Sequence, residues 1–220
     1  MKEKYFDNWR RSMIFLAGAG NLWAIASFGL TIAHHTGNMT LIAFLLVDHK
    51  SNLLPFILLN VSLFVVGGII SGSFFYDRVG NIKKQYLYLT LGFGVLLGLI
   101  RVVFVNPLYV LGFWALGMGV FNGIHIKQND LIIRLTHVTG YLTDLGVNLA
   151  RVYRRDDLAK KRLSIASEML LCFFLGALCS ALLYQIFAGN IIYLIALLYI
   201  GLGLIFVLNY KIDNIKTLQQ

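Results

Sequence analysis

The chain has 220 residues, of which 58% are hydrophobic and only 13% are charged. Soluble globular domains carry about 25% charged residues, so this composition excludes that class and indicates a membrane protein. The formal net charge of +9 does not imply nucleic acid as a partner, because Lys and Arg in membrane proteins accumulate in the segments that face the cytoplasm.

Six apolar stretches are long enough, or nearly so, to cross a bilayer core of about 30 Å, which takes roughly 20 helical residues. In chain order they are residues 12–33, 53–76, 85–105, 107–126, 164–187 and 190–209. Two shorter apolar stretches, 37–47 and 140–150, each reach only about half that thickness as helices. The expected fold class is therefore an all-α polytopic membrane protein, with six transmembrane helices and two half-helices in a single domain, residues 1–220.

A short polar motif lies at the start of each half-helix. The first motif is TGNMT at residues 36–40, and the second is TGYLT at residues 139–143. Gly18 and Asn21, which precede the first motif, are matched by Gly119 and Asn122 before the second. The sequence therefore predicts two copies of one unit, at about 12–105 and 107–209.

Small residues recur in the helix that follows each half-helix. Gly68-x-x-x-Gly72 in the first repeat corresponds to Gly176-x-x-x-Ser180 in the second, and such spacing is typical of closely packed helices. The offset between the repeats grows along the chain. We place this extra length in loops, most of it in the segment 151–162.

The Lys and Arg residues distinguish two layouts of the repeats. If the half-helices do not cross the membrane on their own, the repeats are inverted and 17 of the 19 basic residues face inward, leaving Lys50 and Arg101 outside. If they cross, the repeats are parallel and the division is 14 to 5. The positive-inside rule favours the inverted layout, with both termini cytoplasmic. Each half-helix is then either a re-entrant segment or the second part of a broken span.

The motifs are candidates for a binding site. Gly37 and Gly140 are expected to permit the turn that opens each half-helix, and the Thr and Asn side chains supply polar groups there. Two half-helices that start inside the membrane direct the positive ends of their dipoles toward an anion or polar solute. The alternative is that Thr36 and Thr139 are helix caps in a packed bundle. The candidate solute or ion pathway consists of Asn21, Thr36, Gly37, Asn38, Thr40, Asn122, His137, Thr139, Gly140, Thr143 and Asp144.

Two features of this pathway leave alternatives open. Asp144 is an acid within an apolar region, where ionisable groups are costly and often functional, and its counterpart in the first repeat is Leu41. It either has a proton or cation role or is neutralised by Arg134 or Arg151. Asn21 and Asn122 either complete a polar centre or form interhelical hydrogen bonds.

Enzyme chemistry is not expected. Four histidines near the motifs, His34, His35, His125 and His137, raise a metal site as an alternative, but no compact ligand spacing supports one. No nucleophile with a base and no phosphate-binding loop is present, so no cofactor is expected. The expected partners are the lipid bilayer and a small polar or anionic solute. A homo-oligomer is compatible with the sequence, and nucleic acid is not an expected partner.

Residues 136–146, THVTGYLTDLG, together with TGN at 36–38, resemble the YoaK-like family of bacterial inner-membrane proteins, a domain of unknown function. The resemblance implies an inner-membrane location and supplies no activity. Members usually carry G-x-Q-N-A where this chain has GVFNG at 119–123, and an acid near the position of Asn21. We therefore expect a small transporter or channel, or alternatively a non-transporting scaffold or partner subunit.

Overall fold

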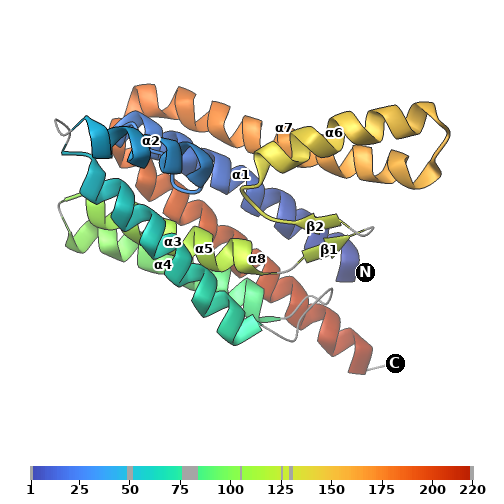
Figure 1. The fold of residues 1–220 in the computed structure, drawn as a ribbon. Coiled ribbons are helices and arrows are strands. Elements are labelled where there is room, and N and C mark those ends of the chain that lie inside the picture. The colour runs from blue at the N-terminus through green and yellow to red at the C-terminus, as the bar shows by residue number, and fades with distance from the viewer. Residues whose placement is uncertain are drawn as a thin grey trace.

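The computed structural model describes residues 2–48, 52–75, 84–104, 106–124, 126–128 and 131–218. Within these ranges the long helices form one bundle, with both termini at the same end (Figure 1). The elements in chain order are α1 (Lys2–Phe28), α2 (His35–Val47), α3 (Leu54–Phe75), α4 (Lys84–Val103), α5 (Leu108–Gly123), β1 (Ile126–Gln128), β2 (Leu131–Ile133), α6 (Val138–Tyr153), α7 (Asp157–Phe187), the 3₁₀ turn η1 (Ala188–Asn190) and α8 (Ile191–Leu218).

Three helical stretches are long and apolar enough to cross a membrane. They are Leu54–Phe75, Gln85–Val103 and Asp157–Tyr210, the last of which contains α7 and most of α8. Large apolar side chains such as Ile69, Phe74 and Val102 lie exposed on these helices, as expected of a surface that meets lipid. The prediction of an apolar, helical, membrane-type fold is confirmed at this level.

The observed helix ends differ from the predicted ones for local reasons. α1 ends at Phe28 because the chain turns at Gly29, whose φ of +69° is a conformation that glycine adopts without strain. α7 begins at Asp157, because the Asp156 carboxylate caps it by accepting hydrogen bonds from the N–H groups of Leu158 and Ala159. The segment 151–162, in which we placed most of the extra loop length, is therefore mostly helical, and the prediction that this length forms a loop is wrong.

The β1–β2 hairpin was not predicted. Its strands pair antiparallel, with Ile126 opposite Ile133, and connect α5 to α6. In the first repeat the corresponding connection runs directly from the end of α1 to α2. The fold is thus all-helical apart from this short hairpin.

Most of the packing lies between the two halves of the chain. The three most extensive helix pairs are α1 with α7, α3 with α5, and α4 with α8. Each pair takes one helix from each predicted repeat. The buried core therefore forms only when both halves are present.

Glycines allow the backbones of α1 and α7 to touch. A Cβ atom at Gly18 would lie 2.1 Å from the carbonyl oxygen of Phe173, and one at Gly176 would lie 1.9 Å from that of Phe15. The hydroxyl of Ser180 donates to the carbonyl oxygen of Ala19 at 2.9 Å in the same interface. Small residues at a helix interface let the backbones of membrane helices approach closely, and α1 and α7 do so here.

The pairing of α3 with α5 has the same geometry. A Cβ atom at Gly67 or at Gly119 would lie 2.1 Å from a carbonyl oxygen, that of Leu116 or of Phe64 respectively. Gly119 occupies the position in α5 that Gly18 occupies in α1, and Gly67 corresponds to Gly176. The two interfaces are therefore built from equivalent residues.

The predicted contact face of α3 was one residue out of register. A Cβ atom at Gly68 or at Gly72 would meet nothing within 4 Å, whereas Gly67 and Ser71 are buried. Adjacent residues point about 100° apart on a helix, so a shift of one position selects a different face. The prediction that Gly68 and Gly72 form the packed face is wrong.

The helix directions follow from these contacts. Residue numbers rise together along α1 and α7, from Arg11 with Glu168 to Ser27 with Tyr184, so these helices are parallel. The contacts of α3 with α5 also run in parallel, whereas α4 and α8 are antiparallel, with Gly94 close to Ile200 and Gly203 close to Leu91.

Aromatic side chains fill the middle of the bundle. The rings of Trp23 and Trp114 stack with centroids 5.8 Å apart, and Phe93 meets Tyr199 edge to face at 5.0 Å. Trp114 and Tyr199 are fully buried. α2 and α6 lie to one side of this packed centre (Figure 1).

Candidate functional site

The half-helices α2 and α6 lie on one side of the bundle and extend in opposite directions (Figure 1). A cavity of about 370 Å³ lies where they begin, and we call it the inter-motif cavity. Residues from both motif regions line it, together with the facing surfaces of α3 and α5. The lining residues are Ala33, His35, Thr36, Phe64, Gly68, Gly119, Asn122, Gly123, Arg134, Thr136 and His137.

The loop before α2 is held by amide side chains. The Nδ2 of buried Asn38 donates to the carbonyl oxygen of Thr31 at 3.2 Å, while the Thr31 hydroxyl donates back to Asn38 Oδ1 at 3.1 Å. Asn60 of α3 donates to the same Thr31 carbonyl at 2.8 Å. Asn21 of α1 accepts from the N–H of Ile32 at 3.1 Å. These bonds fix the direction in which α2 starts.

The loop before α6 is held at equivalent positions by different side chains. The hydroxyl of Tyr141 donates to the carbonyl of Arg134 and accepts from its N–H at 3.0 Å. Tyr141 and Arg134 correspond to Asn38 and Thr31 of the first repeat. The third residue of each Thr-Gly motif therefore ties its half-helix to the residue seven positions earlier.

Asn122 makes a reciprocal pair with Thr136. Its Oδ1 accepts from the Thr136 N–H at 3.1 Å, and its Nδ2 donates to the Thr136 hydroxyl at 2.9 Å. Like Asn21, it therefore fastens a half-helix loop to the preceding helix. Of the two interpretations of these asparagines, hydrogen bonding as a structural link describes Asn21, whereas Asn122 makes such a link and also lines the cavity.

The motif threonines do not cap the half-helices. The N-cap residues are His34 and His137, and neither side chain forms a capping hydrogen bond. Thr36 and Thr139 are exposed within the first turns. The interpretation of these threonines as helix caps is therefore wrong.

The second threonine of each motif bonds within its own helix. Thr40 donates its hydroxyl hydrogen to the carbonyl of Thr36 at 3.2 Å, and Thr143 does the same to Thr139 at 3.2 Å. Such bonds satisfy the hydroxyl without requiring a partner outside the helix.

The motif glycines do not form turns, contrary to expectation. Gly37 and Gly140 lie inside helices, and among the described residues Gly29 is the glycine with a positive φ. A Cβ atom at Gly140 would lie 2.5 Å from the ring of His137, so glycine there lets that ring lie over the helix start. At Gly37 a Cβ atom would meet nothing within 4 Å.

Two histidines join the first motif to the bundle. The ring of His34 stacks on Phe173 of α7 with centroids 5.4 Å apart, and His35 meets Phe64 of α3 edge to face at 4.2 Å. Phe64 and Phe173 occupy equivalent positions in the two repeats. In the described part of the chain, no group of three His, Cys, Asp or Glu side chains is placed to hold a metal, and His125 lies outside that part.

The charge of the cavity lining is positive. Arg134 is a basic lining residue, and no Asp or Glu is among the described residues that line the cavity. The first residues of α2 and the residues before α6 also lie there, and helix N-termini carry about half a positive charge each. From the sequence, Arg134 was expected only as a counter-ion for Asp144. Its offset of 103 from Thr31, the same as between the two motifs, could have indicated that it lies beside the second motif.

Asp144 lies away from the cavity. It is partly exposed on α6, two turns beyond His137, and does not line the inter-motif cavity. Within the described ranges no ion pair joins it to Arg134 or Arg151. Of the predicted pathway residues, Thr36, Asn122 and His137 line the cavity, and the others lie on α1, α2 and α6 without lining it.

Comparisons with known proteins give a family and no activity. No curated protein and no solved structure matches the chain. The family described as "Protein of unknown function (DUF1275)" matches residues 11–206, and the YoaK-like resemblance is consistent with it. Because this match covers most of its length, the chain belongs to the DUF1275 family.

Proposed function

We propose that the protein is a small transporter or channel for small anions, with the inter-motif cavity as the anion site. One observation carries this proposal. A cavity between the starts of two oppositely directed half-helices is lined by Arg134 and by hydroxyl, amide and imidazole groups, and the described lining residues include no acidic side chain. Free N–H groups at helix starts attract anions, and Arg134 adds a full positive charge.

The size of the cavity suits a small solute. Its volume of about 370 Å³ is near the lower end of the range of about 300–1,000 Å³ that is usual for small-molecule sites. Thr136 and Asn122 are already bonded to each other, so they shape the wall. Arg134 and the helix starts are the groups left to contact the anion.

The proposed membrane layout is an inverted repeat with six crossings, by α1, α3, α4, α5, α7 and α8. In that layout α1 and α7 cross in one direction, α3 and α5 in the other, and α4 is antiparallel to α8. All three relations agree with the observed contacts. Eight crossings in a parallel repeat would make α4 and α8 parallel. Both termini then lie on the cytoplasmic side of a bacterial inner membrane.

A route for the anion runs along each half-helix. Thr36 and Thr40 form an exposed stripe on α2, and Thr139 and Thr143 form the equivalent stripe on α6. Residues four apart share a helix face, so each stripe leads away from the cavity in its own direction. In the proposed layout α2 leads outward and α6 leads to the cytoplasm.

A flux assay on the purified, reconstituted protein tests the function. Vesicles are loaded with chloride, nitrate, formate, acetate or phosphate, and release of each anion is measured with protein-free vesicles as background. Flux of at least one anion is expected. Asp144→Asn, a change outside the cavity, is expected to retain flux. Folded protein without flux for any anion would contradict the proposal and favour the scaffold alternative.

A further inference from the structure

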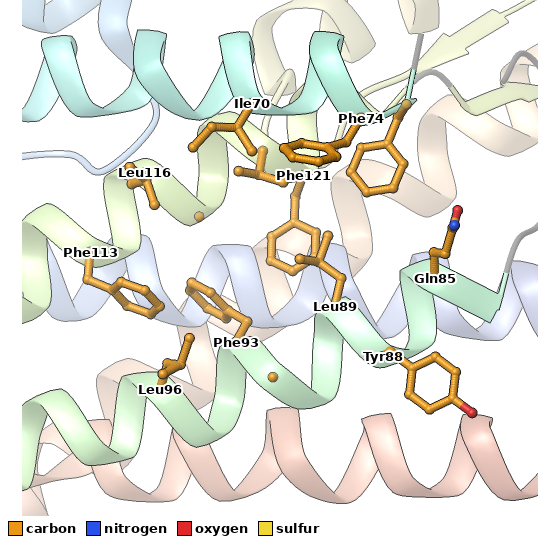
Figure 2. Close-up of a pocket in the computed structure, with 14 residues that line it drawn as sticks. Ile70, Phe74, Gln85, Tyr88, Leu89, Phe93, Leu96, Phe113, Leu116 and Phe121 are labelled. Carbon is orange, nitrogen blue, oxygen red and sulfur yellow. The ribbon is translucent and has the colours of Figure 1, made fainter. Parts of the chain in front are cut away.

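A second cavity lies against other residues of α5 than those that line the inter-motif cavity. α3 and α4 follow each other in the chain, yet each packs mainly on another helix, α3 on α5 and α4 on α8. A groove of about 570 Å³ remains between them, with α5 as its floor (Figure 2). We call it the α3–α4 groove. It is lined by Ile70, Phe74, Phe75, Gln85, Tyr88, Leu89, Gly92, Phe93, Leu96, Phe113, Leu116, Gly117, Val120 and Phe121.

The polarity of the groove changes from one end to the other. Among the described lining residues the polar side chains are Gln85 and Tyr88, and both lie at the end where α4 begins (Figure 2). Leu96 and Phe113 lie toward the other end, and the walls between are aliphatic and aromatic (Figure 2). A ligand that matches this lining has a long apolar part and a polar group at one end.

The groove is kept open by a small residue and faces the surface that meets lipid. A Cβ atom at Gly92 would meet nothing within 4 Å, so the space beside it is empty of protein. On the flanking helices Phe74 is 69% exposed and Leu96 is 49% exposed. A hydrocarbon chain in the membrane can therefore enter the groove sideways without leaving the apolar phase.

We propose that the α3–α4 groove binds one acyl chain of an anionic phospholipid, with the headgroup beside Gln85 and Tyr88. That end of the groove is at the end of the bundle that holds both termini (Figure 1). By sequence, Arg78 and Lys83 lie in the connection from α3 to α4 and Lys84 begins α4, and basic segments next to a membrane helix attract anionic headgroups. This lipid site is separate from the anion site and does not depend on it.

Photo-crosslinking tests the lipid site on the full chain in vesicles. The probe is phosphatidylglycerol with a diazirine in one acyl chain, and labelled residues are mapped by mass spectrometry. Adducts are expected on the floor of the groove, at Leu116 and Val120. Gly92→Leu is expected to lower that yield about tenfold, equivalent to about 1.4 kcal/mol of lost binding, because its side chain fills the groove. Gly92→Ala should give a smaller loss.

The matched control is Gly72→Leu, since Gly72 is exposed on α3, has open space for a side chain and lies outside the groove. The yield of adducts on the groove floor should be the same in Gly72→Leu as in the unmodified protein. Circular dichroism and gel filtration establish that each variant is folded. Adducts spread over outward residues such as Ile69 and Leu99, or floor labelling unchanged by Gly92→Leu, would overturn the site. Equal labelling by a phosphatidylcholine probe would overturn the anionic assignment.

Discussion

Gly18 of α1 lies directly against the backbone of Phe173 on α7, so that even a methyl group at position 18 would overlap the Phe173 carbonyl oxygen. Gly119 of α5 has the same relation to Phe64 of α3. At both points the backbones of the two halves of the chain are in direct contact. The equivalence of the two contacts links the sequence repeat to the packing of the bundle.

The first prediction concerns these glycines. Gly18→Ala and Gly119→Ala should each lower the free energy of unfolding by about 1–3 kcal/mol, because the added methyl group must push two helices apart. Thermal unfolding in detergent measures the change. Gly68→Ala, where the methyl group meets nothing within 4 Å, should differ little from the unmodified protein. A larger loss at Gly68 than at Gly18 would contradict the observed helix register.

The second prediction concerns the loop before α6. Asn122→Leu removes both bonds to Thr136 and leaves a buried N–H without a partner, which should cost about 1–3 kcal/mol. Asn106→Ala is the control, since Asn106 also bonds a backbone N–H but is exposed, where water replaces it. Unfolding in guanidinium measures the free energy of unfolding of both variants. Equal stability would show that the Asn122–Thr136 pair does not hold the loop.

The third prediction tests the anion site through its charge. Arg134→Gln should lower anion flux about tenfold or more, corresponding to at least about 1.4 kcal/mol of lost binding. The flux of Arg134→Lys should lie between those of the unmodified protein and Arg134→Gln, because Lys keeps the charge but lacks the planar guanidinium group that binds oxyanions. Arg154→Gln, at the exposed C-cap of α6, is the control, because it removes one positive charge away from the cavity. Unchanged flux in Arg134→Gln would remove this residue from the site.

The fourth prediction tests the membrane layout. In a variant without Cys172 and Cys179, single cysteines at Asn52 and Asn106 should react with an impermeant thiol reagent added outside the cell. A cysteine at Tyr153, which is 92% exposed, should react only after permeabilisation. Labelling of Asn52 and Asn106 only from inside would support eight crossings in a parallel repeat.

The fifth prediction follows the proposed route. Thr40→Cys should react from outside and Thr143→Cys from inside, and a transported anion should slow both reactions. Leu142→Cys is the matched control, because it is adjacent to Thr143 and exposed on the apolar face of α6. Lipid should shield it from a water-soluble reagent. Reaction of Leu142→Cys as fast as Thr143→Cys would show that α6 does not line a water-filled route.

Some features of this protein followed from the sequence alone because they are local. The apolar lengths located α3 and α4 to within a few residues, and the repeated TG motifs located both half-helices. Helix formation over an apolar stretch depends mainly on neighbouring residues, which a single sequence displays. The correspondence of Gly18 with Gly119 and of Asn21 with Asn122 was visible for the same reason, since matching spacings can be read along a single chain.

Other features were decided only by tertiary structure. Which face of α3 is packed depends on α5, and a shift of one residue from Gly68 to Gly67 turns the contact by about 100°. The meeting of Thr36 with Arg134 in one cavity depends on contacts between halves far apart in the chain. A sequence pattern records the period of a helix, whereas the partner that covers each face is set by long-range packing.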